Sequence, residues 1–388
     1  MFSRRTPSVF TPNALAARLA EARRAGARLI DLTETNPART GLAPEYDEIA
    51  PALANAELAR YEPDPRGGAR AREAVARYYA GIGQAVAPER IVLTASTSEA
   101  YAHLFRLLAD AGDEFLAPAP SYPLFEPLAA LEETRLVSYP LRYETRWRID
   151  TDAVGKLVNA STRGIIVVSP NNPTGSMTSE AEASELESIA CKHDVPILCD
   201  EVFGDFAAEP DESSRRRTFV DVRGALAFVL SGLSKVAGLP QIKLGWIVVA
   251  GPEAQAREAV ERLEWIADAF LSVGAPAQVA LPHLLANRHA FQTRTRERVA
   301  TNRARLGLAL AARADIELLR SDGGWAAVMR VPRTRSEEAW CLELLDRGVL
   351  VHPGHYYDFH DEAYLVVSLL PEPSAFARAV DEIAAIDA

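Results

Sequence analysis

Cysteine is scarce in this 388-residue sequence, which contains only Cys191, Cys199 and Cys341. The number is odd and no pair has the C-x-x-C spacing, so a disulfide framework or a zinc site is not expected. We therefore predict a reducing compartment, the cytoplasm, and no bound metal. Long apolar runs are missing too: no stretch reaches the ~18 residues of a membrane span, and the first twelve residues contain no signal-peptide core.

An excess of positive charge is also absent. The sequence has 42 Lys and Arg against 53 Asp and Glu, a formal net charge of −11. Nucleic acids and anionic membranes require a basic surface, so neither is an expected partner, although a local basic pocket for a small anion is compatible with this charge. The hydrophobic content of 48% is that of a globular protein with a large core, and the length predicts two domains.

Short apolar strands alternate with helical segments from about residue 90 onward. The predicted strands are Ile91–Thr94, Glu114–Ala117, Gly164–Val168, Val195–Cys199, Leu226–Leu230 and Leu244–Ala250. This alternation predicts an α/β fold with a mostly parallel sheet and helices on both faces. After residue 251 two long charged helices lead into a second, smaller α/β unit. Ligands of such sheets bind beyond the carboxyl ends of the strands.

A lysine follows one of these strands, in Ser231-Gly232-Leu233-Ser234-Lys235. Small neighbours at a strand end allow the amine to be buried, which lowers its pKa and makes it a usable nucleophile toward a carbonyl. On its own, a lysine after a strand is usually a surface residue.

Three other strand ends carry polar residues. Ser169–Gly175, with the sequence SPNNPTG, is a rigid turn that offers asparagine amides. Asp200 ends a buried strand, where a carboxylate needs a cationic partner. The turn Ser96-Thr97-Ser98 opens a helix and offers free N–H groups that suit a phosphate. A plain turn or a helix cap would explain each segment separately.

The order and spacing of these segments resemble those of the class I/II aminotransferases, in the fold-type I pyridoxal-phosphate superfamily. The resemblance rests on S-P-N-N-P-T-G, D-E-V-F and S-K-x-x-G…K-x-G-W, and it covers Asp31 to Ala385. It implies bound pyridoxal 5'-phosphate. It also implies a large cofactor domain over residues 46–285 and a small domain made of residues 1–45 and 286–388.

The resemblance assigns roles to individual residues. Lys235 matches the lysine that holds the cofactor as a Schiff base and then shuttles a proton. Asp200 matches the partner of the pyridine nitrogen, which keeps the ring an electron sink. Asn172 matches the residue that bonds the phenolic oxygen, and Tyr122 the residue that stacks on the ring. The implied phosphate ligands are Ser96, Thr97, Ser98, Ser231, Ser234 and Lys243, together with Tyr61 from the neighbouring subunit of a homodimer.

Three positions depart from the family pattern. Phe203 replaces a tyrosine that bonds the phenolic oxygen. Val366, in Tyr364–Leu369, stands where the family has the arginine that clamps the substrate carboxylate, so no bidentate pair can form there. The N-terminal loop has Thr35 where relatives have glycine. The candidate substrate residues are Thr35, Asn36, Arg39 as a substitute clamp, and His355 from a polar cluster in the small domain.

We therefore predict an aminotransferase that moves an amino group from an amino donor to an oxo acid. The loss of the arginine leaves open a pyridoxal-phosphate lyase, decarboxylase or oxidase. A non-catalytic cofactor-binding module is disfavoured by the intact set of Lys235, Asp200 and Asn172.

Overall fold

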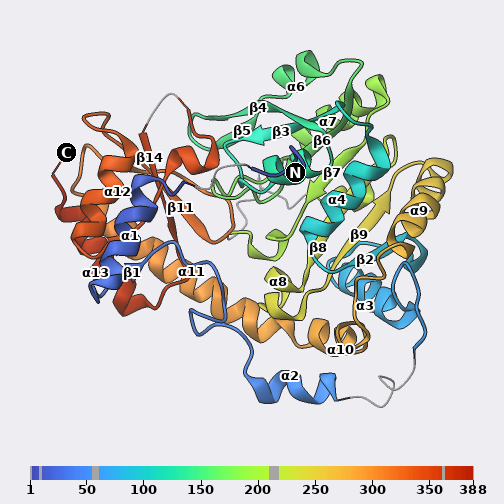
Figure 1. The fold of residues 1–388 in the computed structure, drawn as a ribbon, viewed down its shortest axis with the longest axis horizontal. Helices are drawn as coiled ribbons and strands as arrows, with labels where there is room; N and C mark the ends of the chain where they lie inside the picture. Colours follow the sequence, from blue (N-terminus) through green and yellow to red (C-terminus); the bar gives the residue numbers. More distant parts are fainter. Residues whose placement is uncertain (1, 8–10, 55–60, 209–217, 361–362, 388) are drawn as a thin grey trace.

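The structure is a computed structural model that describes residues 2–7, 11–54, 61–208, 218–360 and 363–387. Two bodies of secondary structure are visible in Figure 1, a large sheet flanked by helices and a smaller unit that combines the N-terminal elements α1 and β1 with the C-terminal elements of the chain. The α/β class and the mostly parallel sheet are confirmed. No helix among the described residues is long and apolar enough to cross a membrane.

The large sheet has eight strands in the described part of the chain, in the order β2-β9-β8-β7-β6-β3-β4-β5. Only β5 and β9 run against the other six. The strands are β2 (Ile91–Thr94), β3 (Glu114–Ala119), β4 (Arg135–Tyr143), β5 (Trp147–Ile149), β6 (Thr162–Val168), β7 (Ile197–Asp200), β8 (Ala227–Gly232) and β9 (Gly245–Ala250).

Helices cover both faces of this sheet because its central strands are apolar on both sides. On β8, Val229 belongs to one hydrophobic cluster and Leu230 to the other, as the alternation of side chains along a strand requires. One face is covered by α3 (Ala69–Ala80), α6 (Thr151–Leu157), α7 (Glu180–His193) and α10 (Ala275–Ala286), and the other by α4 (Thr97–Leu108), α5 (Phe125–Leu131) and α9 (Glu253–Asp268).

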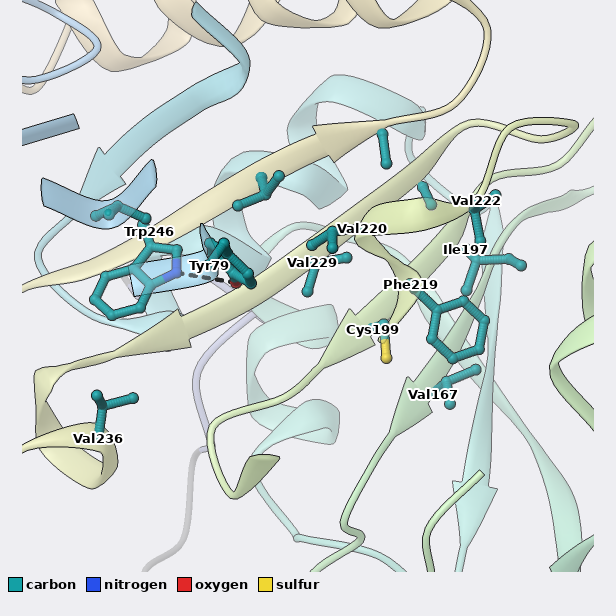
Figure 2. Close-up of a cluster of buried hydrophobic side chains, with 14 of the residues drawn as sticks. Tyr79, Val167, Ile197, Cys199, Phe219, Val220, Val222, Val229, Val236 and Trp246 are labelled. Atoms are coloured by element: carbon teal, nitrogen blue, oxygen red, sulfur yellow. Dashed lines mark hydrogen bonds between the residues drawn. The ribbon is translucent and has the colours of Figure 1, made fainter. Parts of the chain in front are cut away.

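Figure 2 shows the cluster on the α3 face. The indole N–H of the fully buried Trp246 donates to the Tyr79 hydroxyl at 3.2 Å, so this polar group is satisfied inside the core.

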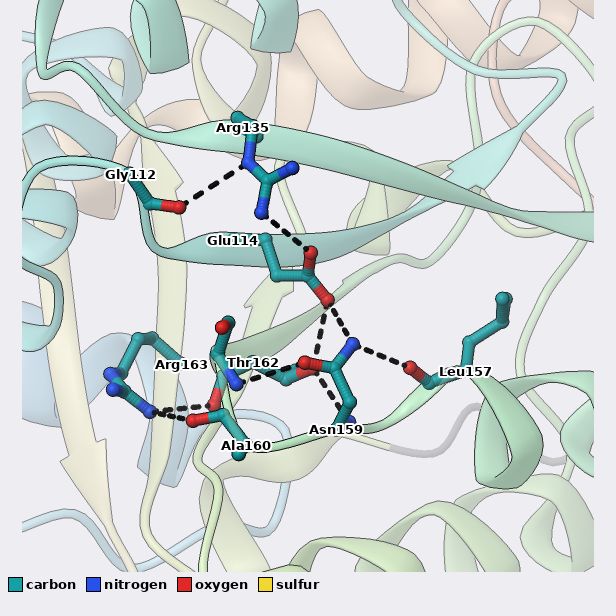
Figure 3. A network of polar contacts seen from close by, with 9 residues as sticks. Gly112, Glu114, Arg135, Leu157, Asn159, Ala160, Thr162 and Arg163 are labelled. Carbon is teal, nitrogen blue, oxygen red and sulfur yellow. Dashed lines mark hydrogen bonds and ion pairs between the residues drawn. The ribbon is translucent and has the colours of Figure 1, made fainter.

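At the amino-terminal edge of the sheet the buried polar groups are paired with one another. Glu114, at the start of β3, accepts hydrogen bonds from Arg135, Asn159 and Thr162 (Figure 3). The carboxylate is only 5% exposed, and three donors offset the cost of burying its charge. This edge is therefore closed and structural, in contrast with the opposite edge described below.

The smaller unit joins the two ends of the chain. Strand β1 (Ile30–Asp31) pairs in parallel with β12 (Val349–Leu350), and a second sheet has the order β10-β11-β14-β13. Its other elements are α1 (Ala14–Arg24), β10 (Glu317–Leu318), β11 (Ala326–Val331), α12 (Glu337–Asp346), β13 (His352–Pro353), β14 (Ala363–Ser368) and α13 (Pro373–Ala385). The division into domains at residues 46–285 against 1–45 and 286–388 stays a prediction.

Two helices connect these bodies. Helix α11 (Arg288–Leu310) runs from the large sheet to the smaller unit (Figure 1), and α2 (Tyr46–Leu53) packs on α10. Single helical turns occur at α8 (Leu233–Val236), which carries the predicted Schiff-base lysine, and at 3₁₀ segments such as Gly354–Tyr357.

Candidate active site

The predicted cofactor residues meet at the carboxyl edge of the large sheet. Asp200 ends β7, which lies between β6 and β8. The turn with Asn172 follows β6, and the segment Ser231–Lys235 spans the end of β8 and α8. Because these strands are parallel neighbours, Asn172, Asp200 and Lys235 converge on one edge although they are 28 to 63 residues apart in sequence (200 − 172 and 235 − 172).

Lys235 lies in an aromatic pocket. Its Nζ is 5.3 Å from the ring centroid of Phe203 and 4.9 Å from that of Trp325. Burial lowers the pKa of Lys235 to about 8, although the nearby Asp200 carboxylate acts in the opposite direction. The shift raises the share of unprotonated amine near neutral pH far above that of an ordinary lysine, and the unprotonated form is the one that acts as nucleophile and proton acceptor.

Asp200 is buried on the α4 side of the sheet. Burial raises the pKa of Asp200 to about 6, against hydrogen bonds from the Val202 backbone and the Tyr101 hydroxyl and the charge of Lys235. The Val202 bond measures 3.0 Å and the Tyr101 bond 3.4 Å. These contacts offset only part of the cost of burying a charged carboxylate, because the pKa of Asp200 stays raised. A bound cation, such as a protonated pyridine nitrogen, would stabilise the charged form further.

The two asparagines of the turn after β6 have different roles. Asn171 is buried, and its side chain is paired with Ser121, Pro120 and Thr174. The half-buried Asn172 amide has no hydrogen-bond partner among the described residues. Asn171 therefore shapes the turn, and Asn172 is the one with donors free for a ligand.

Gly175 closes this turn against the smaller unit. It has φ +67°, and a Cβ there would meet the Ser321 hydroxyl and the carbonyl oxygen of Gly323.

We expect Gly175→Ala to lower the free energy of unfolding by about 2 kcal/mol or more, from left-handed strain plus overpacking. Thermal unfolding measures this loss. Gly26→Ala is the matched control, because Gly26 has φ +72° but no atom within 4 Å of an added Cβ; equal losses for both variants would contradict the contact.

The amino end of α4 forms one wall of the edge. Ser96 is the N-cap and its hydroxyl accepts from the Glu99 N–H, so it is already engaged in the helix. The Thr97 and Ser98 side chains have no hydrogen-bond partner among the described residues and stand at the positive end of the helix, where an anion is favoured.

Two glycines allow this wall to approach the lysine segment. A Cβ on Gly245 would lie 3.1 Å from the carbonyl oxygen of Ser231 and 3.2 Å from the backbone carbon of Ser96, and a Cβ on Gly232 would lie 3.0 Å from the Gly245 Cα. Ser231, at the centre of this close approach, is 1% exposed and its hydroxyl has no partner in the described part of the chain.

The remaining predicted cofactor residues lie at the rim. Ser234 is half-buried, whereas Tyr122 and Lys243 are exposed. Lys243 has φ +57° and a solvent-accessible amine, as a point charge for a phosphate would need. Tyr61 is 84% exposed and lines a surface pocket of about 540 Å³ together with Gly67, Gly68 and Gln278.

The predicted substrate residues are less concentrated. Arg39 is 75% exposed and pairs with Glu34 at 3.3 Å. Asn36 accepts from the Ala38 N–H within its own turn, and Thr35 is exposed. His355 pairs with Glu337 at 3.0 Å. The structure thus gives Arg39 and His355 acidic partners, and the proposed roles of both residues in substrate binding stay predictions.

The N-terminal loop nevertheless reaches the lysine pocket through Leu42. Leu42 packs in one buried cluster with Phe203, Phe206, Phe291, Trp325 and Leu370. The sequence patterns did not predict two neighbours of the site. Trp325 contacts Lys235, and Tyr101 contacts Asp200. The sequence signal for Trp325 was its position after Gly323-Gly324 and before the apolar stretch Ala326–Met329.

Phe203 occupies the family's tyrosine position with a ring that offers no hydroxyl. A hydroxyl there would bond the cofactor's phenolic oxygen and favour the deprotonated imine, so we expect Phe203→Tyr to lower the pKa of the lysine-bound cofactor by about one unit or more. An absorbance titration measures this shift. Phe203→Leu, which removes the ring without adding a hydroxyl, is the control, and an unshifted midpoint in Phe203→Tyr would contradict the assignment.

These residues fit a pyridoxal phosphate. A buried amine, a buried carboxylate, an unpaired amide and a helix amino end lie on one sheet edge, which is the donor set that its carbonyl, pyridine nitrogen, phenolic oxygen and phosphate require. The fold and this edge define a fold-type I pyridoxal-phosphate protein. The model of the family "Aminotransferase class I and II" matches residues 28–383, and the chain belongs to that family, whose members depend on pyridoxal phosphate.

Named relatives are aminotransferases. The chain is 30% identical to Glutamate-pyruvate aminotransferase AlaA of Escherichia coli (strain K12) over 257 residues, which is 66% of this chain and 63% of that protein. It is 28% identical over 331 residues to Arginine–pyruvate transaminase AruH of Pseudomonas aeruginosa, with 81% and 80% covered. The solved alanine aminotransferase of Pyrococcus furiosus has a TM-score of 0.89 at 23% identity, covering 99% and 98%, and shows the shared fold.

Proposed function

We propose that this protein is an aminotransferase that moves an amino group from an amino donor to a 2-oxo acid. The observation that carries the proposal is the convergence of Lys235 and Asp200 at neighbouring strand ends, with burial shifting both pKa values toward neutrality. Relatives named for glutamate, arginine and pyruvate support amino acids and 2-oxo acids as the substrates.

When bound, the cofactor supplies an electron sink for the bond at the substrate α-carbon. Lys235 would hold the cofactor through its Nζ. Once the donor amine has displaced it, the freed Nζ would accept and later donate the proton that the reaction removes from the substrate α-carbon. Asp200 would keep the pyridine nitrogen protonated, while Asn172 and the amino end of α4 would hold the ring and the phosphate. The Phe203 and Trp325 rings keep water away from Nζ.

A screen of amino donors tests the proposal. Glutamate, alanine and arginine are added singly to the holoenzyme, and the absorbance of the lysine-bound cofactor is followed. We expect at least one donor to bleach this band and pyruvate or 2-oxoglutarate to restore it. Release of ammonia without an acceptor would indicate a lyase, release of carbon dioxide a decarboxylase, and formation of peroxide an oxidase. Each of these results would overturn the proposal. An absorbance band that no donor bleaches would also overturn it.

A homodimer completes the proposed site. The exposure of Tyr61, which lines a surface pocket, supports a role for its hydroxyl on the phosphate of a neighbouring subunit. Mixed dimers of Lys235→Ala and Tyr61→Phe subunits test this, because each hybrid contains one site with both residues intact. We expect activity to rise on mixing. A monomer in light scattering, or no rise in activity on mixing, would contradict the proposal.

We also propose a cytoplasmic location, which rests on the cysteine pattern of the sequence.

A further inference from the structure

A histidine stands directly beside Val366, the position at which this chain lacks the family's arginine. Val366 lies on β14 between β11 and β13, opposite Val328 on one side and His352 on the other. Residues directly opposite in antiparallel strands project from the same face, with Cβ atoms ~4.5–5.5 Å apart. The His352 imidazole therefore shares the face of Val366.

This face is turned toward the large sheet. Val366 and Tyr364 belong to the hydrophobic cluster shared with the large sheet, whereas Leu365 and Val367 belong to the core of the smaller unit. The alternation along β14 thus assigns His352 to the side where the cofactor residues lie.

One nitrogen of His352 is engaged and the other is free. Its Nδ1 lies 2.9 Å from the Tyr357 hydroxyl. Burial lowers the pKa of His352 and raises the pKa of Tyr357, so both side chains are neutral near pH 7. Either group can donate in this contact, and in the tautomer in which the Tyr357 hydroxyl donates to Nδ1 the imidazole proton is on Nε2. Nothing in the described part of the chain bonds Nε2.

Hydrogen bonds tie this pair to the cofactor loop. The Tyr357 carbonyl accepts from the Ser121 N–H at 2.9 Å, and the Ser121 hydroxyl donates to the Asn171 side chain at 2.8 Å. Ser121 adjoins Tyr122, and Asn171 adjoins Asn172. Tyr357 is thereby fixed against the segments proposed to hold the cofactor ring, and it orients His352.

Other polar groups of this region have partners. His355 is bonded to Glu337, Arg39 to Glu34, and the Tyr356 hydroxyl to Asn13. Asp31 is the charged group whose field reaches His352, and it favours a protonated imidazole. His352 is the group beside Val366 with a donor available.

We propose that the Nε2–H of His352 binds the carboxylate of the amino acid and 2-oxo acid substrates, at the end of the site where Val366 replaces an arginine. This inference rests on the proposed function and names the group that recognises its substrates. One N–H contacts one carboxylate oxygen, with Val366 and Val328 as an apolar wall. The contact is weaker and less directional than a guanidinium fork.

Binding of a matched pair of unreactive ligands tests the inference. 2-Methylalanine and its carboxamide lack the α-hydrogen that transamination removes, and they differ only in the carboxylate. Calorimetry of the holoenzyme is expected to show at least about tenfold tighter binding of the carboxylate, as a charge-assisted hydrogen bond provides. Equal affinities for the two ligands would overturn the inference.

Three variants identify the residue. His352→Phe should bring the two affinities together, His352→Gln should retain part of the difference through its amide donor, and Val366→Arg should increase the difference by about tenfold or more. Thermal unfolding and cofactor absorbance verify that each variant is folded and loaded. If folded His352→Phe still prefers the carboxylate as strongly as the unmodified enzyme does, the inference is overturned. If His352→Phe does not fold, an undiminished preference in His352→Gln overturns the inference instead.

The donor screen remains a separate test. A carboxylate preference that depends on His352 in a protein that no donor converts would leave this inference standing and remove the proposed function. Bleaching by donors in a protein without that preference would do the reverse.

Discussion

Replacing Lys235 with alanine is expected to slow amino transfer by about a thousandfold or more. The change removes both the covalent attachment of the cofactor and the base that moves the α-proton, and general acid–base catalysis alone contributes ~10²–10⁴-fold. Initial rates with the best donor measure the loss. Borohydride reduction followed by mass spectrometry shows whether the cofactor is still attached to the chain.

Lys192→Ala is the control for this variant. Lys192 lies exposed in the last turn of α7, and its removal should change neither the rate nor the attachment. A Lys235→Ala enzyme within tenfold of the unmodified rate, or one still labelled by borohydride, would be incompatible with the assigned role.

Asp200→Asn is expected to lower kcat by about two to three orders of magnitude, comparable to the loss of a general acid or base. Asparagine keeps an acceptor for Val202 and Tyr101 but carries no charge to hold the pyridine nitrogen protonated. The fold should persist, because a neutral side chain is cheaper to bury than a carboxylate. Initial rates and thermal unfolding measure the two effects separately.

The neighbouring Glu201 provides a matched control. It is also buried, but its carboxylate accepts from the Thr218 hydroxyl at 2.7 Å and the Phe219 N–H at 2.8 Å. Glu201→Gln should therefore reduce stability and leave the rate of the folded enzyme within about threefold, since charged hydrogen bonds stabilise folded proteins by ~1.5–3 kcal/mol. Similar kinetic losses in both variants would show that Asp200 acts only through the fold.

Sequence patterns predicted the centre of the large sheet well because its strands are continuous apolar runs. The buried edge strand β2 was predicted with its exact bounds, Ile91–Thr94, and the central strands were predicted within a few residues. The missed strands β4 and β5 lie at one edge of the sheet, where β4 contains Pro140 and several exposed residues. Such a strand lacks the apolar run that reveals a buried one.

The site was predictable where motifs are local and unpredictable where it depends on pairing across the chain. Lys235, Asp200 and Asn172 each follow a recognisable strand, so their convergence follows from the parallel order. The proximity of Trp325 to Lys235 depends on how the smaller unit docks. That His352 faces Val366 depends on the register of β13 and β14, which no single stretch of sequence specifies.

The pairing of β1 with β12 has a consequence for how the protein is made. Ile30 pairs with Val349, a separation of 349 − 30 = 319 residues. At ~5–20 residues per second, the ribosome needs roughly 16–64 s to supply the partner strand after the first one has emerged. The large sheet can therefore assemble on the nascent chain before the smaller unit closes, and contacts of such high sequence separation form slowly. The cofactor edge is complete early in this order, and the strand that carries Val366 is among the last parts to arrive.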